Sequence, residues 1–183
     1  MTAAAPAIRP WTPDDRAAVL ALILDVQRNE FDLPITADDQ PDLADVDGFY
    51  RGAGGEFWVA VDGTTRVGTI ATLDIGDGRL VLRKLFVARS HRGDAGLGGR
   101  LLATLLAWAG RRSADSIWLG TTAVMTAAHR FYEKHGFARV DATELPAAFP
   151  RMAVDTVFYV RTLGRPSNRP AAPPPERPPV VRD

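Results

Sequence analysis

Residues 82–102 read LRKLFVARSHRGDAGLGGRLL. An apolar run typical of a strand, 80–87, leads into a basic, glycine-rich loop, and this loop leads directly into an amphipathic helix that begins near Gly96. The start of a helix has unpaired N–H groups and a partial positive charge, so it attracts phosphate. Glycines allow the backbone to approach such a ligand closely. The segment therefore predicts a strand–loop–helix unit that binds a pyrophosphate group.

Two widespread phosphate-binding loops do not match this segment. A nucleotide P-loop requires Gly-Lys followed by Ser or Thr, but Gly99 is followed by Arg100. A dinucleotide fingerprint requires a glycine three residues after Gly98, where Leu101 stands. A glycine-rich turn without a ligand is the remaining alternative. Each glycine in a first helical turn costs up to about 1 kcal/mol relative to alanine. A turn without a ligand has no need to keep two such glycines, so their presence favours a phosphate ligand.

The composition limits the class of protein and its partners. The chain has 183 residues, 46% hydrophobic and 24% charged, which is typical of a soluble globular domain. Its 22 basic and 22 acidic residues cancel, so a nucleic-acid partner is not expected. The chain has no cysteine, which fits a reducing cytoplasm and excludes thiolate chemistry. It has no apolar run near the roughly 20 residues of a membrane span, so no membrane partner is expected.

The pattern along the chain predicts one domain, 6–163, followed by a proline-rich, disordered tail, 164–183. The tail holds seven prolines, which exclude a helix or a central strand there. Within the domain, periodicity predicts strands at 8–11, 56–61, 66–75, 80–87, 117–120, 136–140 and 154–160. Helices are expected at 13–28, 42–50, from 96 to near 112, and at 126–135. The fold class is α/β, an α+β mixed sheet of about seven strands and about four helices, with an antiparallel N-terminal meander and a parallel centre.

A second motif lies thirty residues beyond the glycine loop. Residues 128–137 read AHRFYEKHGF, and Ala128 and Tyr132 are four apart, so they share one face of a helix. Gly136 is expected to end that helix, and Phe137 to begin a strand. Taken alone, Tyr132 is more simply interpreted as an ordinary core aromatic residue whose hydroxyl finds a hydrogen-bond partner.

Together, at this separation, the two motifs resemble the GNAT acetyltransferase superfamily, and the resemblance covers nearly all of residues 8–162. It implies a mixed sheet that splays at its centre to hold acetyl-coenzyme A, without a metal. The loop amides would bind the pyrophosphate, and the preceding strand would pair with the pantetheine arm. The coenzyme-binding residues implied are Leu85, Phe86, Val87, Arg92, Gly93, Asp94, Ala95, Gly96, Leu97, Gly98 and Gly99.

The sequence departs from the usual pattern of the family in two places. The loop is one residue longer, as in a bacterial subgroup, because Arg92 lies four residues before Gly96 and Gly93 takes the usual arginine position. Many relatives hold pantetheine with an asparagine that falls here at Met125. The hydroxyl of Thr121 or Thr122 is expected to replace it, and Thr122 is taken as the coenzyme-binding residue. By charge and position, Arg92 is the best candidate among side chains for the phosphates, with Arg100 second.

The resemblance implies an N-acetyltransferase in which a primary amine, of a small molecule or a protein, attacks the thioester directly. A backbone N–H near Val87 would polarise the carbonyl, and Tyr132 would protonate the departing thiolate as general acid. The protein is expected to be a monomer or a homodimer. Two alternatives are a non-catalytic acetyl-coenzyme A sensor and an acyltransferase that uses a longer acyl chain.

The charged residues around this site allow weaker inferences. Glu30, Glu56 and Asp74 are candidates for the general base, but a solvated surface acid is the simpler interpretation of each. The acidic stretch 38–47 is likewise expected to be a solvated helix and loop rather than a site for a cationic acceptor. Arg83 and Lys84 are neighbours in a strand, so only one of them is expected to face the coenzyme side.

Overall fold

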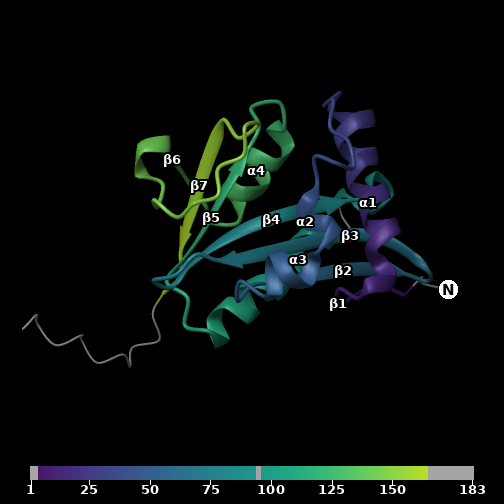
Figure 1. Ribbon diagram of the computed structural model, residues 1–183, viewed down its shortest axis with the longest axis horizontal. Coiled ribbons are helices and arrows are strands. Elements are labelled where there is room, and N and C mark those ends of the chain that lie inside the picture. Colours follow the sequence, from purple (N-terminus) through teal and green to yellow (C-terminus); the bar gives the residue numbers. More distant parts are fainter. Residues whose placement is uncertain (1–3, 94–95, 165–183) are drawn as a thin grey trace, which may run out of the picture.

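The computed structural model describes residues 4–93 and 96–164. One sheet contains seven strands in the order β1-β2-β3-β4-β5-β7-β6, and only the β4–β5 pair in it is parallel (Figure 1). The strands are β1 (Ala7–Pro10), β2 (Glu56–Asp62), β3 (Thr65–Asp74), β4 (Arg79–Val87), β5 (Ser116–Thr121), β6 (Ala138–Val140) and β7 (Val157–Thr162). The described α-helices are α1 (Arg16–Asp25), α2 (Pro41–Ala44), α3 (Leu97–Arg111) and α4 (Thr126–Lys134). The predicted fold class is confirmed.

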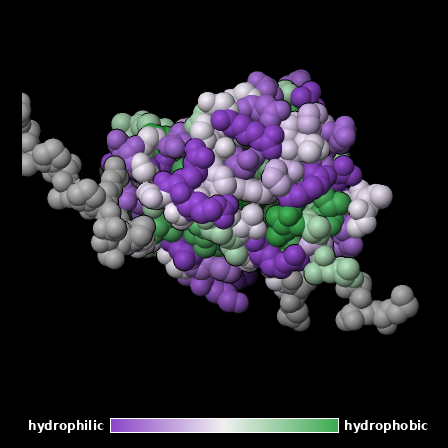
Figure 2. Space-filling view, turned by 90° about the horizontal axis from the view of Figure 1, so that it is seen from below, coloured by the Kyte–Doolittle hydropathy of each residue, from purple (hydrophilic) through white to green (hydrophobic). Residues whose placement is uncertain are grey.

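Alternation along the strands divides the core between the two faces of the sheet. In β2, Trp58 and Ala60 join a cluster with the leucines of α3, while Phe57 and Val59 join a second cluster with α1 and α2. The face in Figure 2 is mostly hydrophilic, with hydrophobic side chains in separate patches. Among the described residues, the exposed large hydrophobic side chains are Phe49, Val124 and Val154. The sheet is therefore covered on both faces, as its apolar pattern requires.

The central strands β4 and β5 separate after a short contact. Residues 79–81 of β4 pair with 116–118 of β5, and within the described sheet no pairing joins the two strands beyond that point. From there β4 is bonded to β3, whereas β5 is bonded to β7 as far as Thr121. Figure 1 shows β5 and β7 diverging from β4. This opening is the splayed centre that the sequence predicted.

A β-bulge interrupts β4 at the opening. Thr69 opposes Phe86 and Ala71 opposes Arg83, so one residue of β3 faces two residues of β4. Lys84 has a φ of 53°, and the Thr69 hydroxyl donates to its carbonyl oxygen over 2.6 Å. Because the bulge breaks the alternation, Arg83 and Lys84 line the same cavity. The regular alternation assumed in the prediction that only one of them faces the coenzyme side therefore does not hold here.

Two predicted elements have different bounds because aspartate side chains cap local turns. The helix predicted at 42–50 divides into α2 and a π-helical turn, Asp47–Arg51, because the Asp45 carboxylate accepts from the Gly48 amide at 2.9 Å. The last strand begins at Val157 rather than 154, because Met152 and Asp155 form a turn. Strand β6 likewise begins two residues later than predicted, at Ala138.

The first helix continues beyond its α-helical part. After α1 ends at Asp25, a π-helical turn follows at Val26–Glu30, so the helical segment extends two residues beyond the predicted end at Arg28. The interval predicted as one domain, 6–163, contains all seven strands. Residues 165–183 of the predicted tail lie outside the described residues.

A buried carboxylate joins the first strand, the first helix and β3. Asp15 is fully buried and accepts hydrogen bonds from Arg9 at 2.7 and 2.8 Å and from Arg66 at 2.8 Å. It also accepts from the Thr12 amide at 2.8 Å and from the Thr12 hydroxyl at 3.1 Å, in a capping box at the start of the first helical segment. Burial by itself raises the pKa of Asp15, but these hydrogen bonds outweigh it and hold the pKa well below its usual range.

Replacing Asp15 is therefore expected to destabilise the fold. Asp15→Asn should lower the free energy of unfolding by about 1.5–3 kcal/mol in urea, because hydrogen bonds to charged groups are lost. Since the folded pKa is depressed, the contribution of Asp15 is complete above about pH 4 and declines as the pH falls further. The difference in unfolding free energy between Asp15→Asn and wild type should therefore become smaller as the pH falls. Asp14→Asn, at an exposed neighbour, is the control, and equal losses in both variants would contradict this role.

Candidate active site

Two cavities open where β4 and β5 separate. The larger has a volume of about 420 Å³ and lies between the end of β4, the glycine loop and α4. The smaller, of about 130 Å³, lies between β4, β5 and the segment before β7. Both cavities are lined by Leu85, Phe86, Met125, Ala128 and Tyr132. The two cavities therefore meet at Tyr132, which comes from the motif on α4.

The larger cavity collects most of the residues that the sequence analysis assigned to a coenzyme. Its lining includes Leu85, Phe86, Val87, Arg92, Gly93, Gly96, Leu97, Gly98 and Gly99. Asp94 and Ala95 lie outside the described residues, and Thr122 lines the smaller cavity instead. The sequence analysis missed Phe31, Phe131 and His135, which also line the larger cavity. Phe131 and His135 were recoverable, because they follow Ala128 on one helix face at spacings of three and seven residues.

The glycines of the loop leave the start of α3 open to a ligand. Gly96 precedes α3 with a φ of 59°, a left-handed conformation that favours glycine. A Cβ atom on Gly98 would lie 3.3 Å from the Phe131 ring, inside ordinary contact, whereas one on Gly99 would meet His135 at 3.5 Å. Backbone N–H groups in a first helical turn have no partner within the helix. This arrangement is suited to a phosphate group.

Arg92 is held by an ion pair at the mouth of the larger cavity. Its guanidinium makes two hydrogen bonds to the Glu30 carboxylate, one of them 2.9 Å long, and Nε donates to the Val87 carbonyl at 2.7 Å. The pair connects the end of the first helical segment to the glycine loop. Arg100 does not line either cavity and donates to the Pro6 carbonyl at 2.8 Å.

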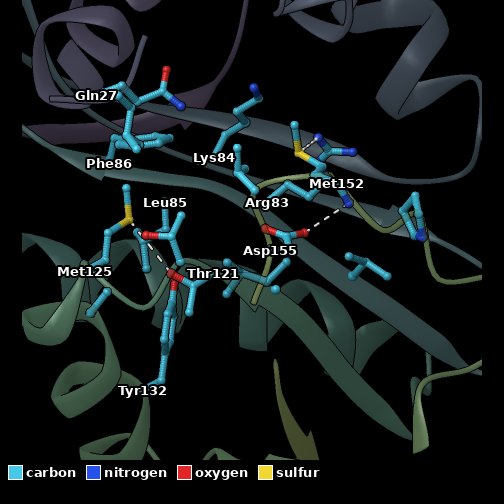
Figure 3. Close-up of a pocket in the computed structure, with 18 of the residues that line it drawn as sticks. Gln27, Arg83, Lys84, Leu85, Phe86, Thr121, Met125, Tyr132, Met152 and Asp155 are labelled. Atoms are coloured by element: carbon cyan, nitrogen blue, oxygen red, sulfur yellow. Dashed lines mark hydrogen bonds between the residues drawn. The ribbon is translucent and has the colours of Figure 1, made fainter. Parts of the chain in front are cut away.

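Tyr132 extends from α4 into the junction of the cavities, as Figure 3 shows. The residue is 7% exposed, and within residues 4–93 and 96–164 its hydroxyl has no hydrogen-bond partner. Burial raises the pKa of Tyr132 above its usual range, and the negative charge of Asp155 raises it further. The phenol therefore keeps its proton at neutral pH.

A second hydroxyl in the smaller cavity also lacks a partner. Thr122 Oγ1 is buried with no hydrogen bond in the described structure, while the Thr122 carbonyl contacts His129 Nε2 at 2.9 Å. Buried polar atoms are usually paired, so an unpaired buried hydroxyl on a residue that lines a cavity is a candidate for a hydrogen bond to a ligand.

A group of buried polar residues surrounds the side chain of Lys84, a residue that lines the smaller cavity. Lys84 Nζ lies 3.2 Å from Asp42 and also donates to Gln40, and Tyr50 donates to the same Asp42 carboxylate. Burial lowers the pKa of Lys84, and the charge of Asp42 opposes this shift. Asp42 is 3% exposed, so the prediction that the acidic stretch is solvated is wrong at this position.

The carboxylates considered as bases from the sequence lie elsewhere. Glu30 pairs with Arg92, Glu56 pairs with Arg51 at 2.7 Å, and Asp74 caps a turn by accepting from Gly76. None of the three lines either cavity. The carboxylate that does line the smaller cavity is Asp155, which is half-buried and comes from the turn before β7.

Residues 21–137 match the model of the acetyltransferase (GNAT) family, whose members are acyl-transfer enzymes. The chain belongs to the GNAT acetyltransferase family. The structure of a GNAT-family acetyltransferase from Staphylococcus aureus is similar with a TM-score of 0.84 and 33% identity, over 87% of this chain and all of that one. The PaiA N-acetyltransferase of Thermoplasma acidophilum, solved in complex with coenzyme A, shares the fold with a TM-score of 0.67 at 13% identity, over 87% and 100% of the two chains.

A curated relative is similar over part of its length. The N-acetylaspartate synthetase of Danio rerio is 38% identical over 123 residues, which are 64% of this chain and 43% of that protein. The chain spans less than half the length of each curated relative of this name that it matches.

Within 4–93 and 96–164, no group of three or more His, Asp or Glu side chains is placed to hold a metal ion. In the same residues no helix has the length and apolar character needed to cross a membrane.

Proposed function

We propose that this protein transfers the acetyl group of acetyl-coenzyme A to a primary amine of a small molecule or a protein by direct attack, with Tyr132 as general acid. The observation that carries this proposal is the meeting of two cavities at one buried phenol on a separated sheet. One cavity suits a phosphate-bearing donor and the other suits a small acceptor. Membership of the family supports the choice of donor.

The residues around the larger cavity fit the coenzyme. The amides at the start of α3, from Leu97 to Gly99, would hold the pyrophosphate, and positive φ angles at Gly93 and Gly96 shape the loop before them. The edge of β4 from Leu85 to Val87 faces the opening and would pair with the pantetheine arm. The unpaired Thr122 hydroxyl would serve in place of the asparagine that is missing at Met125.

When bound, the coenzyme supplies an activated acetyl thioester. A backbone N–H near Val87, on the open edge of β4, would polarise the thioester carbonyl. The chain contains no cysteine, so it has no thiol that could carry the acetyl group as a covalent intermediate. Direct attack by the amine is therefore the route that these residues support.

Tyr132 is suited to protonate the sulfur that departs. Its hydroxyl is unpaired among the described residues and its raised pKa keeps it protonated. Burial in apolar surroundings also raises the pKa of a thiol, so the acid and its leaving group shift in the same direction. The match of proton affinities on which general acid catalysis depends is thereby retained.

The identity of the acceptor can be approached through the curated relatives. Several are named N-acetylaspartate synthetase, so amino acids, with L-aspartate first, are the acceptors to test first. The absence of cysteine fits a reaction in the reducing cytoplasm.

The proposal is tested by incubating the protein with acetyl-coenzyme A and a panel of primary amines while free thiol is measured. Amine-dependent thiol release supports it. Binding of coenzyme A without thiol release, for every amine, would instead favour a sensor. Faster release from longer acyl donors than from acetyl-coenzyme A would favour a longer-chain acyltransferase.

Removing the Tyr132 hydroxyl is expected to impair the chemical step. Tyr132→Phe should lower kcat by about 10²- to 10⁴-fold, the usual contribution of a general acid, and should leave the affinity for coenzyme A nearly unchanged. Tyr159→Phe is the matched control, because Tyr159 donates to Glu133 at 3.0 Å and lines neither cavity. Equal kcat in Tyr132→Phe and wild type would exclude the role.

Adding a methyl group at Gly99 is expected to increase the stability of the free protein and to decrease its affinity for coenzyme A. Gly99→Ala should stabilise the free protein by up to about 1 kcal/mol through helix propensity, since its Cβ meets only His135 at an ordinary distance. The same methyl group should weaken coenzyme A binding, because Gly99 lines the larger cavity. Thermal unfolding with and without coenzyme A measures both effects. Gly110→Ala, in the same helix with free space around it, should stabilise without changing affinity.

The charge of Arg92 is expected to contribute to coenzyme affinity. Arg92→Ala should weaken coenzyme A binding about 10-fold or more, the range for hydrogen bonds to charged groups, as measured by titration calorimetry. Arg100→Ala removes an equal charge outside the cavity and should leave the affinity nearly unchanged. The opposite order of the two variants would assign the phosphate contact to Arg100.

A further inference from the structure

Two opposite charges line the smaller cavity without forming an ion pair with each other. Asp155 and Arg83 both line it, and the charge of Arg83 acts on Asp155. In the described parts of the chain, however, neither side chain belongs to a salt bridge. Figure 3 shows Tyr132 at one end of the cavity, Asp155 in the middle and Arg83 beside Met152 beyond it. Along the cavity, the phenol of Tyr132 is therefore followed by the carboxylate of Asp155 and then by the guanidinium of Arg83.

The carboxylate of Asp155 is held in place by its own turn and by β5. Met152 N donates to Oδ2 at 3.2 Å, and Asp155 N donates to the Met152 carbonyl at 3.1 Å. A Cβ atom on Gly120 would lie only 2.5 Å from Oδ2, so the close approach of the carboxylate to β5 requires glycine there. Asp155 is thus positioned against the strand whose separation from β4 creates the site.

Within the described residues, the guanidinium of Arg83 donates no hydrogen bond to a carboxylate. Its Nη2 contacts the Met152 sulfur at 2.8 Å, and its guanidinium lies 5.6 Å from the centre of the Phe49 ring. Sulfur is a weak acceptor and the ring carries no charge. A guanidinium has five donors in a planar fork that matches a carboxylate. The neighbouring cation Lys84 is not comparable, because it is already paired with Asp42.

We propose, resting on the proposed function, that the acceptor is an amino acid or another amine carrying a carboxylate a few bonds away, which Arg83 binds, while Asp155 binds the ammonium group and removes its proton. The order of Tyr132, Asp155 and Arg83 along the cavity determines which end of the acceptor points toward the acetyl donor. The amine must lie near the donor at Tyr132, and Asp155 is between Tyr132 and Arg83. The cavity has a volume of about 130 Å³, which is enough for the reacting end of a small amine.

The protons balance in this assignment. The ammonium group loses one proton to Asp155, which passes it to solvent, and the neutral amine then forms the new N–C bond as the C–S bond breaks. Tyr132 gives its proton to the departing sulfur, and the second proton of the nitrogen restores the phenol. The net products are the amide, the free thiol and one released proton.

The surroundings of Asp155 suit a base. Burial raises its pKa, while the Met152 amide and the charges of Arg83 and Arg151 lower it less strongly. The other titratable group that faces it is Tyr132, which stays neutral. A raised pKa makes a carboxylate a better proton acceptor near neutral pH.

The carboxylate contact is tested with the standard α-amino acids and their α-methyl esters, in the presence of acetyl-coenzyme A for rates and of coenzyme A for calorimetric binding. Wild type should prefer one or more free acids over the matched esters. Arg83→Gln should raise KM and the dissociation constant of the preferred acid by about 10- to 100-fold, and should change the ester little. Arg111→Gln, at an exposed arginine in the last turn of α3 that lines neither cavity, is the control.

The proton transfer is tested by a pH profile of Asp155→Asn with the preferred acid. Its kcat should fall about 10²- to 10⁴-fold at pH 7 and recover as the pH rises toward the pKa of the amine, where the neutral amine no longer needs a base. Coenzyme A affinity should not change. Asp38→Asn, at an exposed aspartate that lines neither cavity, should behave as wild type.

The outcomes separate this inference from the proposed function. Rapid acetylation of esters and acids alike, with Arg83→Gln unchanged, overturns the carboxylate contact but leaves the acetyltransferase intact. A pH-independent loss of kcat in Asp155→Asn overturns its role as base. Calorimetric binding of a free acid that Arg83→Gln abolishes, without thiol release in wild type, supports the binding contact and contradicts the proposed function.

Discussion

The separation of β4 from β5 after three paired residues is the constraint on which the site depends. Strands that part leave an edge of backbone groups on each side, and such an edge must be paired, covered or used by a ligand. Here two cavities occupy the opening. The bulge at Lys84 acts at the same place, because it turns two neighbouring side chains of β4 toward one cavity.

Ion pairs connect the helical segments to this opening. Arg92 joins the glycine loop to Glu30 at the end of the first helical segment. Lys84 joins β4 to Asp42 in α2. A buried charge pair contributes little net stability, because desolvation offsets the attraction, but breaking one is costly. Their main effect here is to set where the helical segments lie relative to the split strands.

Local patterns predicted the elements and much of the larger cavity. Period-two alternation located the strands, glycine positions located the loop, and the spacing of Ala128 and Tyr132 placed both on one helix face that lines the site. Predictions failed where one side chain competes with the backbone, as Asp45 does within the second helix. They also failed at Asp42, because a charged residue in an acidic run gives no local sign that a lysine 42 positions later will bury it.

The sequence by itself indicated the family and the mixed sheet, and it proposed the loop and the phenol as site residues, because each of these inferences uses motifs of residues that lie near one another in the chain. Only the tertiary structure placed Asp155 and Arg83 in one cavity with Tyr132. These residues lie in three separate segments, and a β-bulge reverses the side on which Arg83 or its neighbour was expected. Contacts between distant segments and a broken alternation produce no periodic pattern in the sequence. The residues on the acceptor side of the site could therefore be identified only from the tertiary structure.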